Sequence, residues 1–262
     1  MPERLHVVIA VFNSKGGVGK TTVAVNLAAA LASSSRRVLL VDLDSAASAS
    51  RWLGISPKHL RPSSASCLLE KYPTLKAVRH TATPNLDVLP GSIELANADV
   101  ALCGVRGREV AVRRMLERVG LHYDIVVLDC SPSLSLLGIN AIVAADALVV
   151  PLSPEALVVD ALDATMTSVD RVRSRMSSSS ALLGIVLTLV EPQHRHTREI
   201  ADRVRAERRD TVFHTEIRWT AALSAAPESR QTIFESAPRS PSADAFKRLA
   251  GEVLHRLGPL KS

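Results

Sequence analysis

The chain has 262 residues, of which 47% are apolar and only 3% aromatic, and its formal net charge is +6. We expect a single domain over residues 1–262 with a large aliphatic core. No apolar run approaches the roughly 20 residues of a membrane-spanning helix, and the start does not read as a signal peptide, so we expect a cytoplasmic protein without membrane insertion. Cys67, Cys103 and Cys130 have no CxxC spacing, which disfavours a disulfide framework or a zinc site.

The positive charge is concentrated in the last third of the chain. Residues 168–262 carry 16 Lys and Arg against 11 Asp and Glu. This surplus suits a surface that faces a polyanion, but it also suits a basic protein whose charge only aids solubility. Charge alone leaves both interpretations open.

Apolar, β-branched runs alternate with helical patterns along most of the chain. This alternation predicts an α/β fold with a single doubly wound, mostly parallel sheet flanked by helices. The six main strands are expected over residues 6–12, 37–41, 86–89, 124–128, 147–150 and 182–189, with a further short strand over 211–215.

Three helical patterns stand between and after these strands. Residues 21–32 are Ala-rich and apolar nearly all round, as expected for a helix pressed against a sheet. Residues 155–175 form a second long pattern, and residues 242–257 place their apolar side chains on one stripe that ends at Gly258. Residues 54–84, rich in Ser, Pro and basic residues, indicate an irregular excursion.

The decisive motif follows the first predicted strand and opens the first helix. Glycines there let consecutive backbone N–H groups face inward, and the helix N-terminus adds positive partial charge, which makes a cradle for phosphates. Lys20 is expected to neutralise the β- and γ-phosphates, and the Thr21 hydroxyl to bind Mg²⁺. The predicted nucleotide-binding residues are Lys15, Gly16, Gly17, Val18, Gly19, Lys20, Thr21 and Thr22.

Carboxylates close two of the predicted strands. Asp42 and Asp44 follow the second strand and Asp129 follows the fourth. Because ligands of open α/β sheets bind at the carboxyl ends of the strands, these side chains are expected to converge on the phosphate loop. The alternative, that they only cap turns, carries more weight for Asp42 than for the other two.

The segment KGGVGKTT departs from the strict pattern GxxxxGK(S/T), since Ser14 stands where the first glycine belongs. It resembles the deviant Walker A motif of ParA, MinD, nitrogenase iron protein and related dimeric ATPases. The resemblance implies that Lys15 reaches across an ATP-bound homodimer to the partner's phosphates. It also implies that Asp129 holds Mg²⁺ through water, that Asp44 orients the hydrolytic water, and that Asp42 supports the metal or the loop after the second strand.

Later segments resemble ParA-like partition ATPases in the same order: VLLVDLD, YDIVVLDCSPSL, ALVVPLSPEAL, LLGIVLT, LSAAP and AFKRLAGEVL. The LSAAP segment implies that Pro227 lies near the adenine. After Asp44 the family's Pro-Gln-Gly-Asn is replaced by Ser45 to Ser48, and an arginine common before LSAAP in DNA-binding relatives is absent. These departures bear on the rate of hydrolysis and on how DNA is bound.

Other basic residues could supply a DNA surface. Over residues 194–210, Arg198, Arg205 and Arg209 share one helical face, which is able to follow phosphates without reading bases. A solvated face with local ion pairs explains the pattern equally well.

These inferences predict a slow, partner-stimulated ATPase that uses ATP/ADP and Mg²⁺. It would dimerise on ATP, bind nucleoid DNA nonspecifically, and position a chromosome or plasmid with a ParB-like adaptor. The alternatives are a positioning ATPase for a carboxysome, chemosensory cluster or cellulose synthase, a MinD-like regulator, an iron-sulfur ATPase and an amide-forming ligase. We expect neither an N-terminal helix-turn-helix domain nor a C-terminal amphipathic membrane helix.

Overall fold

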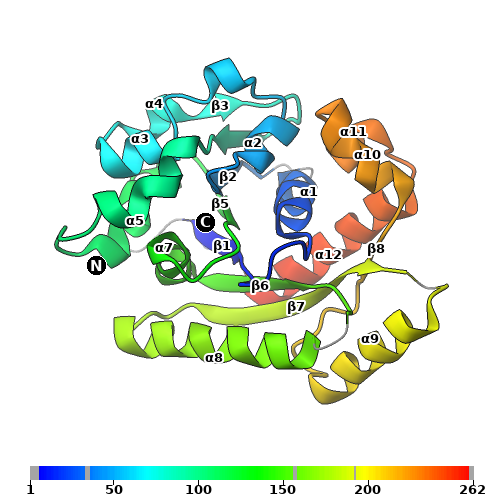
Figure 1. The fold of residues 1–262 in the computed structure, drawn as a ribbon. Helices are drawn as coiled ribbons and strands as arrows, with labels where there is room; N and C mark the ends of the chain where they lie inside the picture. The colour runs from blue at the N-terminus through cyan, green and yellow to red at the C-terminus, as the bar shows by residue number, and fades with distance from the viewer. Residues whose placement is uncertain (1–5, 33–35, 156–157, 192, 260–262) are drawn as a thin grey trace.

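The computed structural model describes residues 6–32, 36–155, 158–191 and 193–259, and within them an eight-stranded sheet has helices on both faces (Figure 1). The strand order is β3-β4-β2-β5-β1-β6-β7-β8, and every pairing is parallel except that of β3 with β4. The predicted fold class is confirmed. The strands are β1 (Val7–Val11), β2 (Val38–Leu43), β3 (Arg79–His80), β4 (Leu86–Leu89), β5 (Ile125–Cys130), β6 (Ala147–Leu152), β7 (Ala181–Val190) and β8 (Ile217–Arg218).

Helices cover the sheet in two layers. The main helices are α1 (Lys20–Ala32), α2 (Ser48–Trp52), α3 (Ser64–Leu69), α4 (Thr74–Ala77), α5 (Ala98–Ala101), α6 (Ala111–Met115), α7 (Leu136–Ala144), α8 (Val158–Met176), α9 (Arg195–Glu207), α10 (Ala221–Ser229), α11 (Ile233–Ser236) and α12 (Pro241–Leu257). Short 3-10 turns occupy Pro57–His59, Ile93–Asn97, Arg108–Val110 and Val119–Leu121. None of the helices in the described ranges is both long and apolar enough to cross a membrane.

The position of the core explains why apolar and polar residues do not alternate along the central strands. All residues of β2, β5 and β6 are buried, because helices pack on both faces of the sheet. One layer packs α1 against β1, β2 and β5 and α12 against α1, β7 and β8, and α7 with α3 and α6 fills the other. The apolar stripe of α12 buries Phe246, Leu249 and Val253 in the first layer, as its sequence pattern predicts.

The predicted strand over 211–215 is wrong. Only Val212 forms a bridge there, to Ile185 of β7. Side chains of α12 also bind backbone groups of this segment: Arg256 donates to the Thr211 and Val212 carbonyls at 3.1 and 2.8 Å. Glu252 accepts from the backbone N–H groups of His214 and Thr215 at 2.7 and 2.8 Å.

The excursion over residues 54–84 is more ordered than its composition indicates. It contains a 3-10 turn, α3, α4 and β3. A capping box begins α3, since the Ser63 hydroxyl accepts from the backbone N–H of Ser66 and the Ser66 hydroxyl accepts from that of Ser63. The long helix expected from residue 155 begins at Val158 among the described residues, and positions 156–157 lie outside them.

Candidate nucleotide-binding site

Three neighbouring strands bring the predicted site residues together. The register pairs Val11 of β1 with Asp129 of β5, and Asp129 with Asp42 of β2. The loop that follows β1 therefore starts beside both carboxylates at the carboxyl edge of the sheet. This is the edge where open α/β sheets bind ligands.

The loop has the backbone that its glycines allow. Gly17 and Gly19 adopt left-handed backbone conformations with φ of +75° and +80°. Residues that carry a Cβ rarely adopt such φ values. α1 begins at Lys20, so the free N–H groups of a 13-residue helix face the loop. These features make a cradle for an anion.

Two polar side chains outside the motif fix the loop in place. Asn13, almost fully buried, donates to the Pro151 carbonyl at 2.8 Å and accepts from the backbone N–H of Lys15 at 2.9 Å. The Thr188 hydroxyl of β7 donates to the Val18 carbonyl at 2.8 Å. The loop is thus anchored to β6 and to β7.

The two lysines of the loop have different environments. Lys20 is 7% exposed, and its Nζ donates to the Lys15 carbonyl at 2.6 Å. Burial lowers the pKa of Lys20, although the charge of Asp129 opposes the shift. Lys15 stands at the rim with 35% of its side chain exposed, and it pairs with Glu155 at 2.7 Å.

Asp129 is fully buried, and the Thr21 hydroxyl is a protein donor near it. Neither of its oxygens makes a hydrogen bond of ordinary geometry within the described ranges. Burial and the neighbouring Asp42 charge raise the pKa of Asp129 well above its usual value, while the Thr21 hydroxyl and the Lys20 ammonium oppose this rise. A buried carboxylate with so few donors is suited to receive a cation or its water shell.

Asp42 is buried too, but protein groups already satisfy it. The backbone N–H and hydroxyl of Ser50 donate to its Oδ2 at 2.9 and 2.6 Å, and the N–H of Asp44 donates to its Oδ1 at 3.1 Å. Burial still raises the pKa of Asp42 to about 6. These contacts hold the segment after β2, so they suit the supporting role that the sequence allowed for Asp42.

Asp44 directly follows β2 and is partly exposed. Its Oδ1 accepts from the backbone N–H of Ala46 at 2.9 Å, in the turn that replaces the family's Pro-Gln-Gly-Asn segment. A carboxylate fixed in this way, next to the phosphate loop but open to water, can hold a water molecule in place.

The donor set fits a magnesium ion shared with a nucleotide. Thr21 and Asp129 offer hard oxygen atoms at the start of α1 and the end of β5. Throughout the described ranges no three His, Cys, Asp or Glu side chains form a group able to hold a metal by themselves. A magnesium ion at this edge would therefore take its other ligands from phosphate and water oxygens, as Mg²⁺ commonly does.

Two of the predicted DNA residues, Arg198 and Arg205, lie on α9, where ion pairs are frequent, whereas Arg209 lies in the turn that follows the helix. Arg205 contacts Glu216 at 2.6 Å and Asp202 at 3.5 Å, and other arginines of the helix also pair with acids. By contrast, Arg198 and Arg209 have no acidic partner within the part of the chain that is described.

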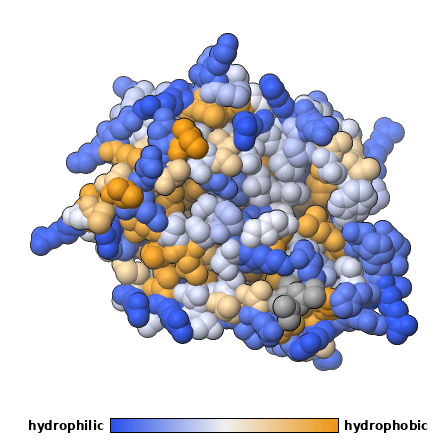
Figure 2. All heavy atoms as spheres, in the orientation of Figure 1, coloured by the Kyte–Doolittle hydropathy of each residue, from blue (hydrophilic) through white to orange (hydrophobic). Residues whose placement is uncertain are grey.

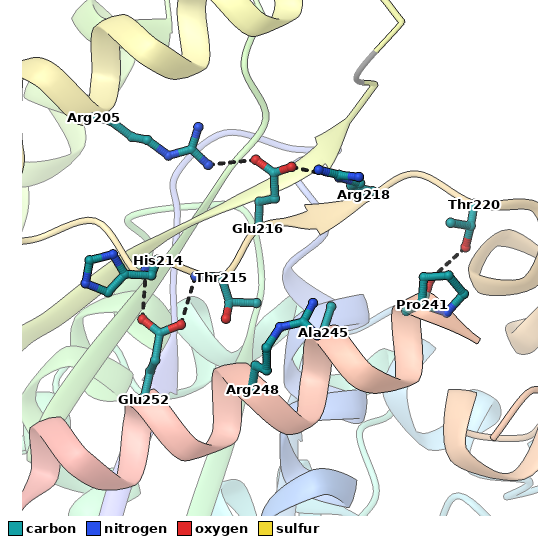
Figure 3. A pocket seen from close by; sticks show the side chains of 11 residues that line it. Arg205, His214, Thr215, Glu216, Arg218, Thr220, Pro241, Ala245, Arg248 and Glu252 are labelled. Carbon is teal, nitrogen blue, oxygen red and sulfur yellow. Dashed lines mark hydrogen bonds and ion pairs between the residues drawn. The ribbon is translucent and has the colours of Figure 1, made fainter. Parts of the chain in front are cut away.

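A cavity of about 710 Å³ opens beside Arg205, between β8 and α12 (Figure 3). Glu216 holds Arg205 and Arg218 on one wall. Arg248 of α12 points into the space and makes no ion pair with a described acidic residue. This cavity is distinct from the phosphate loop, because no loop residue lines it.

Sequence reasoning missed several residues that support the site: Asn13, Ser50, Glu155 and Thr188, and also Thr165, whose hydroxyl hydrogen-bonds that of Ser14 at 2.7 Å. A polar residue at the end of a buried strand was an available signal for Asn13, and a lone threonine within the apolar run LLGIVLTLV was one for Thr188. The partnership of Asp42 with Ser50 had no signal, since it depends on how α2 returns over β2. Pro227 lies exposed within α10, and its contact with adenine stays a prediction.

Comparisons with known proteins agree with this geometry. Residues 6–182 match a family model described as an AAA domain. The sporulation initiation inhibitor protein Soj of Bacillus subtilis is 36% identical over 246 residues, which cover 94% of this chain and 97% of that protein. The chromosome-partitioning ATPase Soj of Thermus thermophilus is 37% identical over 249 residues, 95% of this chain and 96% of that one.

Solved structures show the same architecture. Cobyrinic acid a,c-diamide synthase from Mycobacterium smegmatis, with bound ATP analog and magnesium, has a TM-score of 0.82 at 32% identity and covers 94% of this chain and 93% of its own. An ATP complex of McdA from Cyanothece has a TM-score of 0.85 at 21% identity, covers 98% of each chain, and shows likeness of fold.

The strand-loop-helix unit at the carboxyl edge of this sheet defines a P-loop nucleotide-binding protein of the doubly wound class. Within that class, the motif with Lys15 and the likeness to Soj along nearly the whole chain are specific. The chain belongs to the family of ParA/Soj-type ATPases.

Proposed function

We propose that this chain is an ATP-driven switch that dimerises around its nucleotide, binds nucleoid DNA without sequence preference, and positions a chromosome or plasmid with a ParB-like partner. The observation that carries the proposal is the contrast between the two lysines of the loop. Lys20 is buried, whereas Lys15 stands at the rim, where a second copy could meet it. The names of the Soj relatives support chromosome partitioning as the process.

Phosphoryl transfer needs positioning and charge neutralisation more than covalent chemistry. Lys20 and the N–H groups of the loop bind the β- and γ-phosphates, and Asp44 orients the attacking water. Thr21 and Asp129 would hold Mg²⁺, which supplies further neutralisation of phosphate charge. Asp42 keeps the segment that carries Asp44 in place through Ser50.

The ion pair of Lys15 with Glu155 is compatible with a role across a dimer. The side chains of Lys15 and Glu155 are 35% and 55% exposed, and such surface pairs are worth only about 0–1 kcal/mol. Lys15 can therefore leave Glu155 for the phosphates of a second copy at little cost. A charge-assisted contact with phosphate would replace the pair.

DNA binding is supported by the unpaired cations of the last third of the chain. Arg198, Arg209 and Arg248 lack acidic partners within the described ranges, and Arg205 shares Glu216 with Arg218. Contacts from such residues to phosphates carry no sequence information, and they weaken as salt rises.

The switch is tested by sedimentation velocity with ATP, ADP or no nucleotide. We expect wild type to dimerise only with ATP, and Asp44→Ala to stay dimeric because hydrolysis stops. Lys15→Gln should bind ATP but remain monomeric, while Arg175→Gln, an exposed change at the end of α8, should behave as wild type. Monomer profiles for both wild type and Asp44→Ala would refute dimerisation.

DNA binding is tested by gel shift on a duplex of about 60 base pairs at several salt concentrations. Arg198→Glu with Arg209→Glu should abolish the ATP-dependent shift. Arg203→Glu is the matched control, because Arg203 already pairs with Glu207 at 2.8 Å on the same helix. Equal binding by these variants would exclude α9 and the turn after it as the DNA surface and leave the cavity around Arg248 as the surface to test.

A ligase is the second candidate, because the diamide synthase is 32% identical over 94% of this chain. An enzyme of that kind would transfer phosphate to a small acceptor. Phosphate release from ATP without any small-molecule acceptor, accelerated by DNA and a ParB-like protein, would favour the switch. Acceleration by another cargo adaptor instead would redirect the assignment to a non-DNA cargo.

A further inference from the structure

A groove on α3, α4 and α6 has no role in the nucleotide site. It is a cavity of about 670 Å³, and no residue of the phosphate loop lines it. Its apolar lining includes Leu68, Tyr72, Leu75, Leu102, Val105 and Met115. These residues come from two segments that lie far apart in the sequence and meet only in the fold.

The apolar lining is partly open to water. Tyr72, Leu75 and Val105 are 37%, 38% and 47% exposed. In Figure 2, hydrophobic side chains stand among hydrophilic ones over α3 and α5, at the left of the view. Contiguous exposed apolar surface with a polar rim marks interaction sites, because covering it removes apolar area from water.

The rim of the groove is strongly basic. Five cations line it, Lys71, Lys76, Arg108, Arg114 and Arg118, against a single acid, Glu117. Among the described residues, Arg108 is the member of this set that pairs with an acid, Glu109 at 3.1 Å. The other four cations are available to an outside partner.

Tertiary hydrogen bonds fix the walls of the groove. The Thr74 hydroxyl donates to the Met115 carbonyl at 2.8 Å, which ties α4 to α6. Asn140 of α7 donates to the Arg108 carbonyl at 2.8 Å and accepts from the Val112 N–H at 3.1 Å. The groove therefore exists before any partner binds, which lowers the entropic cost of docking.

We propose that this groove binds an acidic, amphipathic segment of a partner protein. Large apolar side chains on one face of the segment would occupy the space between Leu75, Val105 and Met115, and its carboxylates would face the basic rim. Nucleic acid fits less well, because a phosphate backbone would leave the apolar lining uncovered. The proposal does not depend on ATP binding or on the DNA surface.

The test is a selection with the full-length chain as bait and a phage-displayed library of random peptides of about 16 residues. We expect enriched peptides to be net negative, with large apolar residues at helical spacing. In fluorescence polarisation with one such synthetic peptide, Leu75→Glu should weaken binding at least about tenfold, because a charge then enters the apolar lining. The pair Lys71→Glu with Arg114→Glu should do the same by reversing the rim.

Matched controls carry similar changes outside the groove. Ile93→Glu alters another exposed apolar residue and Arg175→Glu another exposed arginine, and both should keep affinity within about twofold. Each variant is first checked for an unchanged melting temperature; the rim variants keep the test valid if Leu75→Glu does not fold. The proposal is overturned if no acidic peptides are enriched, or if groove variants bind them as tightly as wild type. It is equally overturned if these variants abolish binding to phosphatidylglycerol vesicles or duplex DNA but do not weaken binding to the peptides.

Discussion

Asp129→Asn should stabilise the nucleotide-free protein while it removes magnesium-dependent ATP binding. Asp42 sets the scale: a rise in its pKa from 3.8 to about 6 corresponds to about 3 kcal/mol at neutral pH. Asp129 is equally buried and lacks the donors that Asp42 has, so ionised Asp129 should cost the fold no less. Allowing for an imperfectly satisfied amide, we expect Asp129→Asn to raise the free energy of unfolding by about 2 kcal/mol.

The assay is thermal and urea unfolding in EDTA without nucleotide, followed by circular dichroism. A gain of about 2 kcal/mol corresponds to roughly 4–8 °C in a protein of this size. Asp170→Asn, which loses only an exposed pair with Arg173, should change stability by less than about 0.5 kcal/mol. A lower melting temperature for Asp129→Asn would show that the carboxylate is well satisfied in the free protein.

The pH dependence gives an independent check of the same reasoning. Because the folded-state pKa values of Asp42 and Asp129 are raised, the stability they contribute is present at low pH and is lost as pH rises through those values. In EDTA, wild type should therefore gain stability as pH falls from 8 towards 6. Asp129→Asn should show a shallower gain over this window.

Further variants test the loop and the C-terminal packing, all in the full-length chain. Lys20→Ala should abolish ATP binding in calorimetric titration, because it removes the buried cation of the phosphate cradle. Thr188→Val should weaken ATP binding by roughly 3- to 10-fold, since it removes one hydrogen bond of about 1 kcal/mol that anchors the Val18 carbonyl; unchanged affinity would show that the loop holds its shape without β7. Arg256→Ala should cost about 3 kcal/mol in urea unfolding, because the guanidinium donates to three backbone carbonyls and lies 4.2 Å from the Phe213 ring centre.

The sheet could be predicted because its signal is local. Each central strand is a run of buried aliphatic residues, and the six main predicted runs agree with the strands to within about two residues at each end. The segment over 211–215 has the same kind of apolar residues, but α12 binds its backbone through Arg256 and Glu252. Strand hydrogen bonds and side chains from a distant helix compete for the same backbone groups, and the outcome of this competition leaves no pattern in the local sequence.

The candidate site also has a part that could be predicted from the sequence and a part that could not. The phosphate loop is contiguous in the sequence, so the roles of its glycines and lysines could be predicted without a structure. Whether a carboxylate is satisfied, by contrast, depends on residues brought from elsewhere. Asp42 and Asp129 both close buried strands, yet only Asp42 receives donors from a following helix, through Ser50. That difference separates a supporting carboxylate from one suited to a metal.

The buried charges at this edge of the sheet favour one kind of ligand. Lys20 has its pKa lowered by burial and Asp129 has its pKa raised by burial, so each lacks enough opposite charge in the protein alone. A phosphate group alone would complement Lys20 but repel ionised Asp129, and a metal alone would do the reverse. A magnesium nucleotide brings both charges together, with the anion at the lysine and the cation at the carboxylate. We therefore expect the unfavourable burial of these two charged side chains to favour a magnesium nucleotide over phosphate or metal alone.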